Sequence, residues 1–170
     1  VQIGFADFLA RETGDPYAGW LAAQSSKALH DDILMRLYRI VRDKTTYNTT
    51  LPENAPKFTW HQDIGEVMMH SDLGNTKKNL ALGFRSSIFG SGSHTVSNQN
   101  AFQLIYKGAD VYRSTGYYLN FEDAHNLMSY RHSRAHNTIL VNGIGQPFTT
   151  KGYGIINCAM GGEHITYCSG

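Results

Sequence analysis

The sequence predicts an α+β protein with helices in residues 1–44, a polar linker at 45–59 and an antiparallel β-sandwich from residue 60. Apolar residues recur at helical spacing before position 44, whereas short runs of β-forming residues separated by Gly, Asn and Ser follow position 60. No helix-length segment lies between those runs. This arrangement favours antiparallel pairing of the strands over a parallel sheet with helical crossovers.

A break in the helical pattern lies at residues 13–16, Thr-Gly-Asp-Pro. Asp15 can cap a helix with its side-chain oxygen, and Pro16 suits the first turn of that helix. Beyond the break, apolar residues recur every four positions and arginines occupy the opposite face, which predicts an amphipathic helix that needs a partner surface. The apolar positions are Leu29, Ile33, Leu37 and Val41, and the basic positions are Arg36, Arg39 and Arg42.

Strands are predicted at 66–70, 79–84, 101–106, 109–112, 136–141, 153–159 and 163–168, where β-forming residues cluster. Lys107 and Gly108 predict a tight hairpin between two of these runs, and Asn142 with Gly143 predicts another turn. The last run ends without an element that would pair its edge. We therefore expect residues 60–170 to form only the start of the sandwich, and residues 1–44 to form the end of a helical domain.

The charge balance of the chain excludes two broad classes of binding protein. The chain has fifteen Lys and Arg residues and fourteen Asp and Glu residues, which gives a net charge of +1. A chain without a net field is not a general binder of nucleic acid or of membrane surfaces, so neither is expected as a partner. The sequence has no apolar run of membrane-spanning length and no leader, so we expect a mature or excised segment. Cys158 and Cys168 allow one disulfide or two free thiols.

The densest polar cluster lies at residues 91–100, SGSHTVSNQN, directly before the strand predicted at 101–106. Loops of Gly, Ser, Asn and His that enter a strand often carry catalytic groups, which makes His94, Asn98 and Gln99 candidate site residues. The same composition fits a turn-rich connector whose side chains bond their own backbone. Both interpretations stay open.

A second polar cluster lies at residues 129–138, SYRHSRAHNT. Its two arginines, two histidines and tyrosine would form a local cationic patch suited to a carboxylate or sulfate, because arginine binds planar anions through two parallel hydrogen bonds. Tyr130, Arg131 and Arg134 are therefore candidate substrate-binding residues. A solvated edge whose arginines bond loop carbonyls explains these residues equally well. His94 and His136 are possible metal ligands, but no HxH, HExxH or CxxC spacing accompanies them.

Taken in order, several segments resemble the heparinase II/III-type polysaccharide lyases, a family that includes heparin, heparan and alginate lyases. The matching segments are FLARETGDP at 8–16, the stretch 84–102 that ends in SHTVSNQNAF, Gly108, STGYY at 114–118, His125, RAHNTILVNG at 134–143 and Gln146. The likeness spans nearly the whole chain. It implies that residues 1–44 are the C-terminal hairpin of an (α/α) toroid and that residues 60–170 open the family's β-sandwich.

The resemblance also implies a reaction, which is β-elimination on a uronic-acid polysaccharide. His94 takes the position of the family histidine that acts at the reaction centre as base or carboxylate partner. The tyrosine that serves as acid or base belongs to the toroid upstream in the same polypeptide. The family's structural zinc would fall on Val96, Ser114 and His136, and only His136 is a zinc-ligand type, so the zinc set is degraded. No spacing supports Asp110 or His132 as a substitute ligand.

Two functional hypotheses follow. In the first, the chain is part of a polysaccharide lyase in which His94 is catalytic. In the second, it is a carbohydrate-binding or structural β module that keeps the lyase scaffold without the chemistry. The candidate substrate-binding residues are Asn98, Gln99, Tyr130, Arg131 and Arg134. The resemblance implies an acidic polysaccharide and the upstream toroid domain as partners, and a periplasmic or secreted location.

Overall fold

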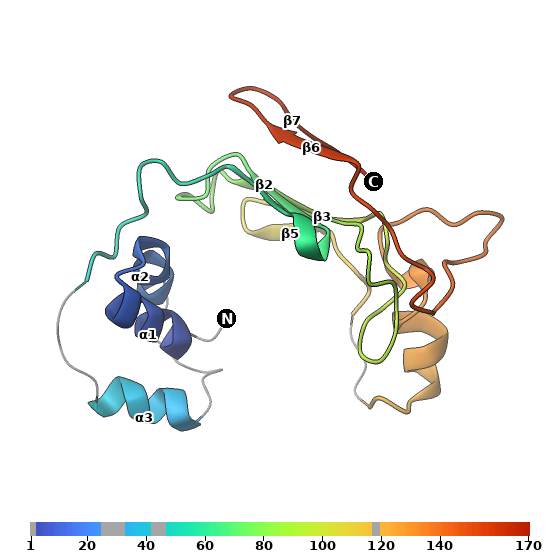
Figure 1. The fold of residues 1–170 in the computed structure, drawn as a ribbon, viewed down its shortest axis with the longest axis horizontal. Coiled ribbons are helices and arrows are strands. Elements are labelled where there is room, and N and C mark those ends of the chain that lie inside the picture. Colours follow the sequence, from blue (N-terminus) through green and yellow to red (C-terminus); the bar gives the residue numbers. More distant parts are fainter. Residues whose placement is uncertain (1–2, 25–32, 42–46, 117–119) are drawn as a thin grey trace. The chain divides into compact units, whose positions relative to one another are not determined.

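The computed structural model describes residues 3–24, 33–41, 47–116 and 120–170, and the chain divides into two compact units. The first unit is Val1–Ala55 and is helical, whereas the strands of the described residues all lie in the second unit, Pro56–Gly170 (Figure 1). The combination of helices with antiparallel sheets confirms the predicted α+β class. The domain limits at 44 and 60, and the assignment of the helices to a toroid, stay predictions.

The helical unit begins with α1 (Ile3–Thr13) and α2 (Pro16–Ala23), which meet at the predicted break. Gly14 has a left-handed φ of 69°, and the Asp15 side chain accepts hydrogen bonds from the N–H groups of Tyr17 and Ala18 at 2.8 and 3.1 Å. The cap and the proline in the first turn together start α2, as predicted. Small residues are buried on both helices, namely Ala6 and Ala10 of α1 and Ala18, Gly19 and Ala22 of α2.

The amphipathic helix predicted after the break is α3 (Ile33–Val41). It contacts α1 through Tyr38 and Phe8, whose ring centroids lie 5.4 Å apart in an edge-to-face arrangement. Its exposed apolar side chains are Ile33, Leu34, Leu37, Ile40 and Val41. Leu29 and Arg42 lie outside the described residues. The described part of the apolar stripe therefore remains exposed, as expected of a helix that needs a further partner surface.

The second unit is built on a five-stranded antiparallel sheet in the order β1-β2-β3-β4-β5. Its strands are β1 (Phe58–His61), β2 (Glu66–His70), β3 (Leu80–Arg85), β4 (Ala101–Tyr106) and β5 (Ala109–Tyr112). Lys107 and Gly108 both have positive φ, 54° and 81°, which is the backbone of a two-residue hairpin turn. The predicted hairpin is therefore confirmed. Every strand of the sheet pairs with its neighbour in sequence, and the connection between β3 and β4, residues 86–100, contains the polar cluster that the sequence singled out.

Residues 136–141 do not form the predicted strand. Val141 makes one isolated bridge to Ile144 across the predicted turn, and the preceding residues are irregular. The Phe102 N–H donates to the Asn137 carbonyl at 3.1 Å, and the Asn137 side-chain amide donates to the Phe102 carbonyl at 3.0 Å. A side chain thus takes the place of a main-chain donor beside β4. The ladder stops there because it needs successive main-chain N–H groups.

A second sheet consists of β6 (Cys158–Gly161) and β7 (Thr166–Ser169), both shifted toward the C-terminus of the predicted runs. β6 contacts β1, where Gly161 packs against the Phe58 side chain. Cys158 pairs with Ser169 and Cys168 with Ala159. Adjacent positions of a strand face opposite sides, so the two thiols point away from each other. They are free, and the geometry disfavours the alternative of a disulfide.

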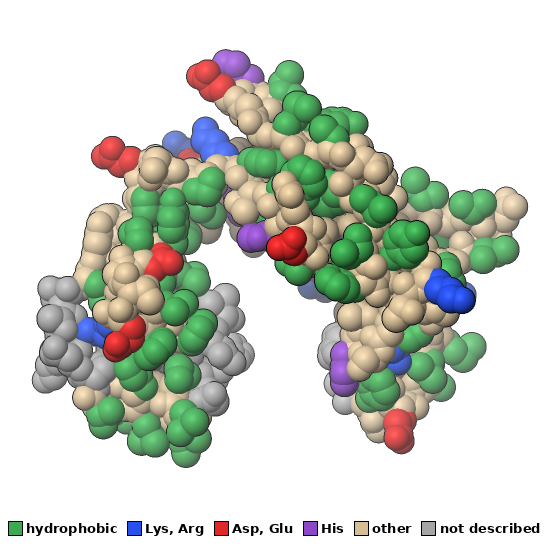
Figure 2. Space-filling model, in the orientation of Figure 1, with side chains coloured by type: hydrophobic (Ala, Val, Ile, Leu, Met, Phe, Trp, Pro, Cys, Tyr) green, Lys and Arg blue, Asp and Glu red, His purple; other side chains and the backbone are tan. Residues whose placement is uncertain are grey.

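The interior of the second unit is mostly polar beneath its loops. Its largest fully buried side chains are Val67, Asn126, Ser86, Ser87, Ser91, Ser97 and Ser133. Many apolar side chains lie outside instead, including Ile139, Ile144 and Ile165, and Figure 2 shows hydrophobic side chains spread over its visible surface. No helix among the described residues is long and apolar enough to cross a membrane. Hydrogen bonds rather than a large apolar core therefore hold these loops.

Candidate functional site

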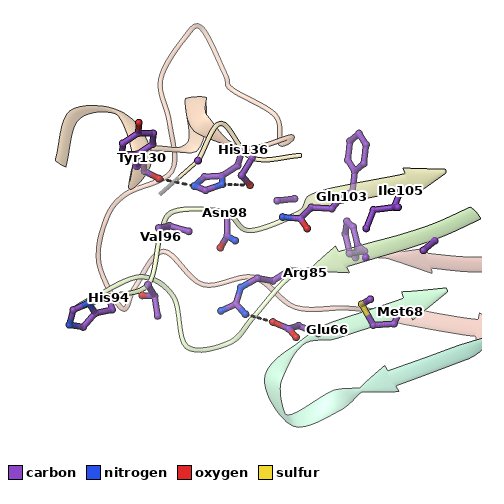
Figure 3. Close-up of a pocket in the computed structure, with 18 residues that line it drawn as sticks. Glu66, Met68, Arg85, His94, Val96, Asn98, Gln103, Ile105, Tyr130 and His136 are labelled. Carbon is purple, nitrogen blue, oxygen red and sulfur yellow. Dashed lines mark hydrogen bonds and ion pairs between the residues drawn. The ribbon is translucent and has the colours of Figure 1, made fainter. Parts of the chain in front are cut away.

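A cavity of about 550 Å³ lies in the second unit beside β3, β4 and the loop that precedes β4 (Figure 3). The strands contribute apolar side chains, among them Phe84 and Phe102. The polar and ionisable lining residues are Glu66, Arg85, His94, Thr95, Asn98, Gln103, Ser114, Tyr130 and His136. The fold therefore brings together four residues that the sequence singled out, at positions 94, 98, 130 and 136. It leaves the other three, at 99, 131 and 134, out of the lining.

The loop that carries His94 is held by its own hydrogen bonds. The Thr95 hydroxyl lies 2.6 Å from both the N–H and the carbonyl oxygen of Gly92, and the Ser91 hydroxyl donates to the Val96 carbonyl at 3.0 Å. Ser93 has a left-handed φ of 50°, which turns the chain just before the histidine. The interpretation as a self-bonded turn is thus confirmed, and the same turn presents His94 at the cavity.

His94 lies at the rim of the cavity and is exposed. Its ring centroid is 4.7 Å from that of Phe121, with the ring planes tilted by 50°. Figure 3 shows the imidazole at the outer end of its loop, well apart from the ring of His136. An exposed imidazole packed against one aromatic ring has a restricted orientation and remains accessible to a ligand.

Asn98 and Gln99 are neighbours in the loop with different surroundings. The Asn98 side chain is half-buried and lines the cavity (Figure 3). Gln99 is 5% exposed, and its Oε1 accepts a hydrogen bond from the Ser87 N–H at 2.6 Å while its Nε2 donates to the Gly90 carbonyl at 3.4 Å. The Gln99 amide is thus used inside the loop. It anchors the loop, which corrects the expectation of a substrate contact.

Gln146 explains why a distant glutamine accompanies the loop motif. Its Oε1 accepts a hydrogen bond from the Gln99 N–H at 2.8 Å, and its Nε2 donates to the Gln99 carbonyl at 2.7 Å. The hydroxyl of Thr138 donates to the same carbonyl at 2.7 Å. One side chain thus imitates the hydrogen bonding of a neighbouring strand. This clamp fixes the main chain directly after Asn98.

His136 has both ring nitrogens engaged. Nε2 lies 3.0 Å from the Tyr130 carbonyl oxygen and Nδ1 lies 2.9 Å from the Ser114 hydroxyl (Figure 3). Because a carbonyl oxygen only accepts, we assign the proton to Nε2, and Nδ1 then accepts from the serine. Burial lowers the pKa of His136, and the hydrogen bond to the Tyr130 carbonyl acts in the opposite direction. The imidazole is therefore neutral at neutral pH and joins three segments of the cavity wall.

The residues at the zinc positions that the sequence resemblance implies do not fit a zinc ion. Zinc sites in proteins use three or four nitrogen, sulfur or carboxylate ligands. Val96 offers no donor atom, and the Ser114 hydroxyl lies against the Nδ1 atom of His136. The possible substitutes Asp110 and His132 are each bonded to an arginine of their own segment. Across the described ranges, no three His, Cys, Asp or Glu side chains form a group that could hold a metal.

The predicted cationic patch does not form. Arg131 is 6% exposed, donates to the Ser93 carbonyl, and has its guanidinium carbon 3.9 and 5.0 Å from the ring centroids of Phe148 and Phe121. Arg134 is exposed and bonds to a histidine nitrogen within its own turn. Of the three candidate substrate-binding residues in this segment, Tyr130 alone lines the cavity. The two arginines therefore have different roles, neither of them a contact within this cavity.

Glu66 and Arg85 line the cavity although the sequence did not indicate them. They face each other in the register of β2 and β3, and Arg85 Nη1 lies 2.5 Å from Glu66 Oε1 (Figure 3). Gln103 of β4 lies opposite Gly83 of β3 and lines the same cavity. Nineteen positions separate the ion pair in the chain, so strand register brings the two charges together. The signal in the sequence was limited to one charge near the end of each predicted strand.

Neither a protein-family model nor a curated protein sequence matches the chain. Solved structures do match it. The heparan sulfate lyase HepC from Pedobacter heparinus has a TM-score of 0.68 at 13% identity, over 98% of this chain and 22% of that chain. The heparinase III BT4657 gene product has a TM-score of 0.68 at 10% identity, with the same coverage. The chain has a heparinase III-type fold.

This heparinase III-type fold confirms the resemblance that the sequence motifs carried, while the assignment of the helices to a toroid stays a prediction. The match covers 98% of the chain, so it includes the helices and both sheets. The chain spans 22% of the length of these two enzymes.

Proposed function

We propose that the chain supplies one side of the active site of a polysaccharide lyase that cleaves a uronic-acid polysaccharide by β-elimination. The observation that carries this proposal is a cavity, within a heparinase III-type fold, that one loop lines with His94 and Asn98. The other side of the site belongs to a helical toroid domain of the same polypeptide. Structural neighbours that are a heparan sulfate lyase and a heparinase III support this reaction class, and we expect the protein to act in the periplasm or outside the cell.

The chemistry assigns distinct tasks to the two loop residues. The C5 proton of a uronate becomes removable only when the adjacent carboxylate is neutralised and the charge of the enolate intermediate is stabilised. His94 acts at this centre, as the base that takes the proton or as the partner of the carboxylate. The Asn98 amide donates a hydrogen bond to a carboxylate oxygen. A tyrosine of the toroid protonates the leaving glycosidic oxygen.

Arg85 supplies positive charge inside the cavity. Its side chain is 28% exposed and that of Glu66 is 37% exposed, so both remain accessible to a ligand. A substrate carboxylate competes with the Glu66 carboxylate for the Arg85 guanidinium, because the two carboxylates bind arginine in the same planar geometry. Glu66 thus limits how strongly the empty cavity attracts anions. This side of the site would recognise the carboxylate through Arg85, in place of the cationic patch that the sequence suggested around Arg131 and Arg134.

The proposed reaction proceeds without zinc at the family position. The hydrogen bonds of His136 to Ser114 and to the Tyr130 carbonyl hold two of the three zinc positions, 114 and 136, together without a metal. This substitution is possible because a neutral imidazole donates through one nitrogen and accepts through the other. Elemental analysis of the purified protein tests this proposal.

A second candidate function is a carbohydrate-binding module without catalysis. The observation that favours it is the loss of zinc-ligand chemistry at Val96 and Ser114, since a scaffold can diverge in this way after its activity is lost. Such a module would bind acidic polymers in the same cavity through Asn98 and Arg85. It would not need a particular side chain at position 94.

The test is an assay of the full-length polypeptide on several uronate polymers, followed by the ultraviolet absorbance of the unsaturated uronate product. We expect activity in the wild type and a loss of at least about 100-fold in kcat in His94→Ala, the usual size of a general-base contribution. His164→Ala is the matched control, because His164 is exposed in the turn between β6 and β7. Binding without product formation on every polymer would favour the module. Wild-type activity in His94→Ala would remove this histidine from the mechanism.

A further inference from the structure

We propose that Arg131 is a positioning residue that locks the loop of His94 through the Ser93 carbonyl and does not touch the substrate. Its catalytic consequence rests on the proposed function, whereas its effect on the loop can be measured without any substrate.

Arg131 holds the His94 loop on both sides of the histidine. Its guanidinium donates to the Ser93 carbonyl, and its own main-chain carbonyl accepts a hydrogen bond from the Ser97 N–H at 2.9 Å. Positions 93 and 97 flank His94. A single residue from a distant segment therefore fixes the main chain before and after the candidate catalytic side chain.

The contact with Ser93 controls the direction of the chain at His94. Ser93 has a φ of 50°, in the left-handed region that a residue with a side chain adopts only where its surroundings hold it. The carbonyl bonded to Arg131 belongs to the peptide group between Ser93 and His94. Rotation of this peptide group would break the hydrogen bond and change the ψ angle of Ser93 and the φ angle of His94. The guanidinium thus stabilises the conformation that presents the histidine.

Two aromatic rings hold the guanidinium in place and connect it to His94 by a second route. The guanidinium carbon lies 3.9 Å from the Phe148 centroid and 5.0 Å from the Phe121 centroid. The Phe121 ring also contacts the imidazole of His94, with centroids 4.7 Å apart. A flat, delocalised cation suits this arrangement, whereas lysine lacks both the planar face and the fork of donors. Phe121 therefore transmits the position of Arg131 to the imidazole itself.

Burial separates this role from substrate binding. Arg131 is 6% exposed and does not line the cavity, so its charge is out of reach of a polymer in the cavity. Its Nε atom has no hydrogen-bond partner among the described residues. A buried charge is unfavourable unless its surroundings compensate it, and here a carbonyl oxygen and two ring faces do so. All of these contacts of the Arg131 guanidinium therefore lie within the support of the His94 loop.

The test compares Arg131→Ala and Arg131→Lys with Arg134→Ala, a matched control because Arg134 is exposed and bonds only within its own turn. The first readout is the set of histidine Cε1–H NMR signals of the chain, in which His94→Gln identifies the His94 signal. We expect both Arg131 variants to shift or broaden that signal, because the ring no longer has one position beside Phe121. The signal of His136 should stay in place, and Arg134→Ala should change neither.

The second readout is the kinetics of the full-length polypeptide. We expect kcat to fall about 10- to 100-fold in Arg131→Ala, the size of effect that a misplaced catalytic group produces, with KM within about twofold of the wild type. Added guanidinium ion at low concentration should restore part of kcat in Arg131→Ala and none in Arg131→Lys, whose ammonium occupies the site.

Three results would overturn the proposal. An unchanged His94 signal in Arg131→Ala would mean that the loop keeps its conformation without the guanidinium. A rise in KM at constant kcat would make Arg131 a substrate contact. Joint loss of the His94 and His136 signals in both variants would mean that Arg131 supports the whole unit and not the loop. If the wild-type polypeptide has no lyase activity, the proposed function fails, and the NMR readout still decides the positioning role.

Discussion

Replacing Gln146 with methionine removes two hydrogen bonds to the Gln99 main chain, and a longer one of 3.3 Å to the Thr138 hydroxyl, at almost constant side-chain volume. Gln146 accepts from the Gln99 N–H at 2.8 Å and donates to the Gln99 carbonyl at 2.7 Å. The carbonyl keeps a second donor, the Thr138 hydroxyl at 2.7 Å. The N–H loses its partner within a residue that is 5% exposed, and methionine cannot supply an acceptor of similar strength.

The two losses set the expected size of the effect. An unpaired buried donor costs about 1–3 kcal/mol and the loss of an ordinary hydrogen bond about 0.5–1.5 kcal/mol, so the free energy of unfolding should fall by about 2–4 kcal/mol. In a domain of this size the midpoint of thermal unfolding should then fall by roughly 6–15 °C. Calorimetry and urea unfolding measure the two quantities independently.

Two further variants separate the clamp from a general effect of losing a glutamine. Gln62→Met changes an exposed glutamine between β1 and β2 and should stay within about 0.5 kcal/mol of the wild type. Gln146→Glu should be at least as destabilising as Gln146→Met at neutral pH, because a carboxylate oxygen would face the Gln99 carbonyl. A loss below about 1 kcal/mol in Gln146→Met would refute the reasoning, since the Gln99 N–H would then have found another partner.

Three other predictions concern metal, charge and pH. Treatment with a chelator should leave activity and the thermal midpoint unchanged, and elemental analysis that finds one tightly bound zinc per chain would contradict this. Glu66→Gln should release Arg85 and lower KM for a uronate polymer by up to about tenfold, whereas Arg85→Gln should raise KM. If neither variant changes KM, the Glu66–Arg85 ion pair takes no part in substrate recognition. Burial lowers the pKa of His136, and of His70 likewise, so stability is fully present above the ordinary value of 6.5 and falls as the pH drops below it. His136→Gln should weaken this dependence of the unfolding midpoint on pH, and His164→Gln should not.

The elements that sequence patterns predicted correctly depend on neighbouring residues. The break before α2 needs only a left-handed Gly14, a capping Asp15 and Pro16, which are adjacent in the chain. The hairpin at Lys107 and Gly108 likewise follows from two residues in a row. Turn and cap geometry is decided by local backbone preferences, and these can be read directly from a sequence.

The predictions that the structure corrected depend on distant partners. The run 136–141 has the composition of a strand. However, the Asn137 side-chain amide bonds the Phe102 carbonyl, to which a main-chain N–H would donate in a β-ladder. Gln99 and Arg131 have the residue types of a ligand site, but both are buried and bonded to the main chain of their surroundings. A polar residue type indicates what a side chain can bond. Burial decides whether a ligand can reach it.

The amino-acid sequence alone predicted the change from helices to strands, the turn-rich loop at His94 and the likeness to heparinase II/III-type lyases. These features follow from periodicity, turn chemistry and motifs, which are local properties. Tertiary structure alone decided that Glu66 pairs with Arg85 and that Gln146 hydrogen-bonds the Gln99 main chain, 47 positions away in the sequence. The same holds for the hydrogen bond from Arg131 to the Ser93 carbonyl beside His94. The physical reason is that strand register and loop packing set these contacts, and both depend on the simultaneous arrangement of segments that no local pattern links.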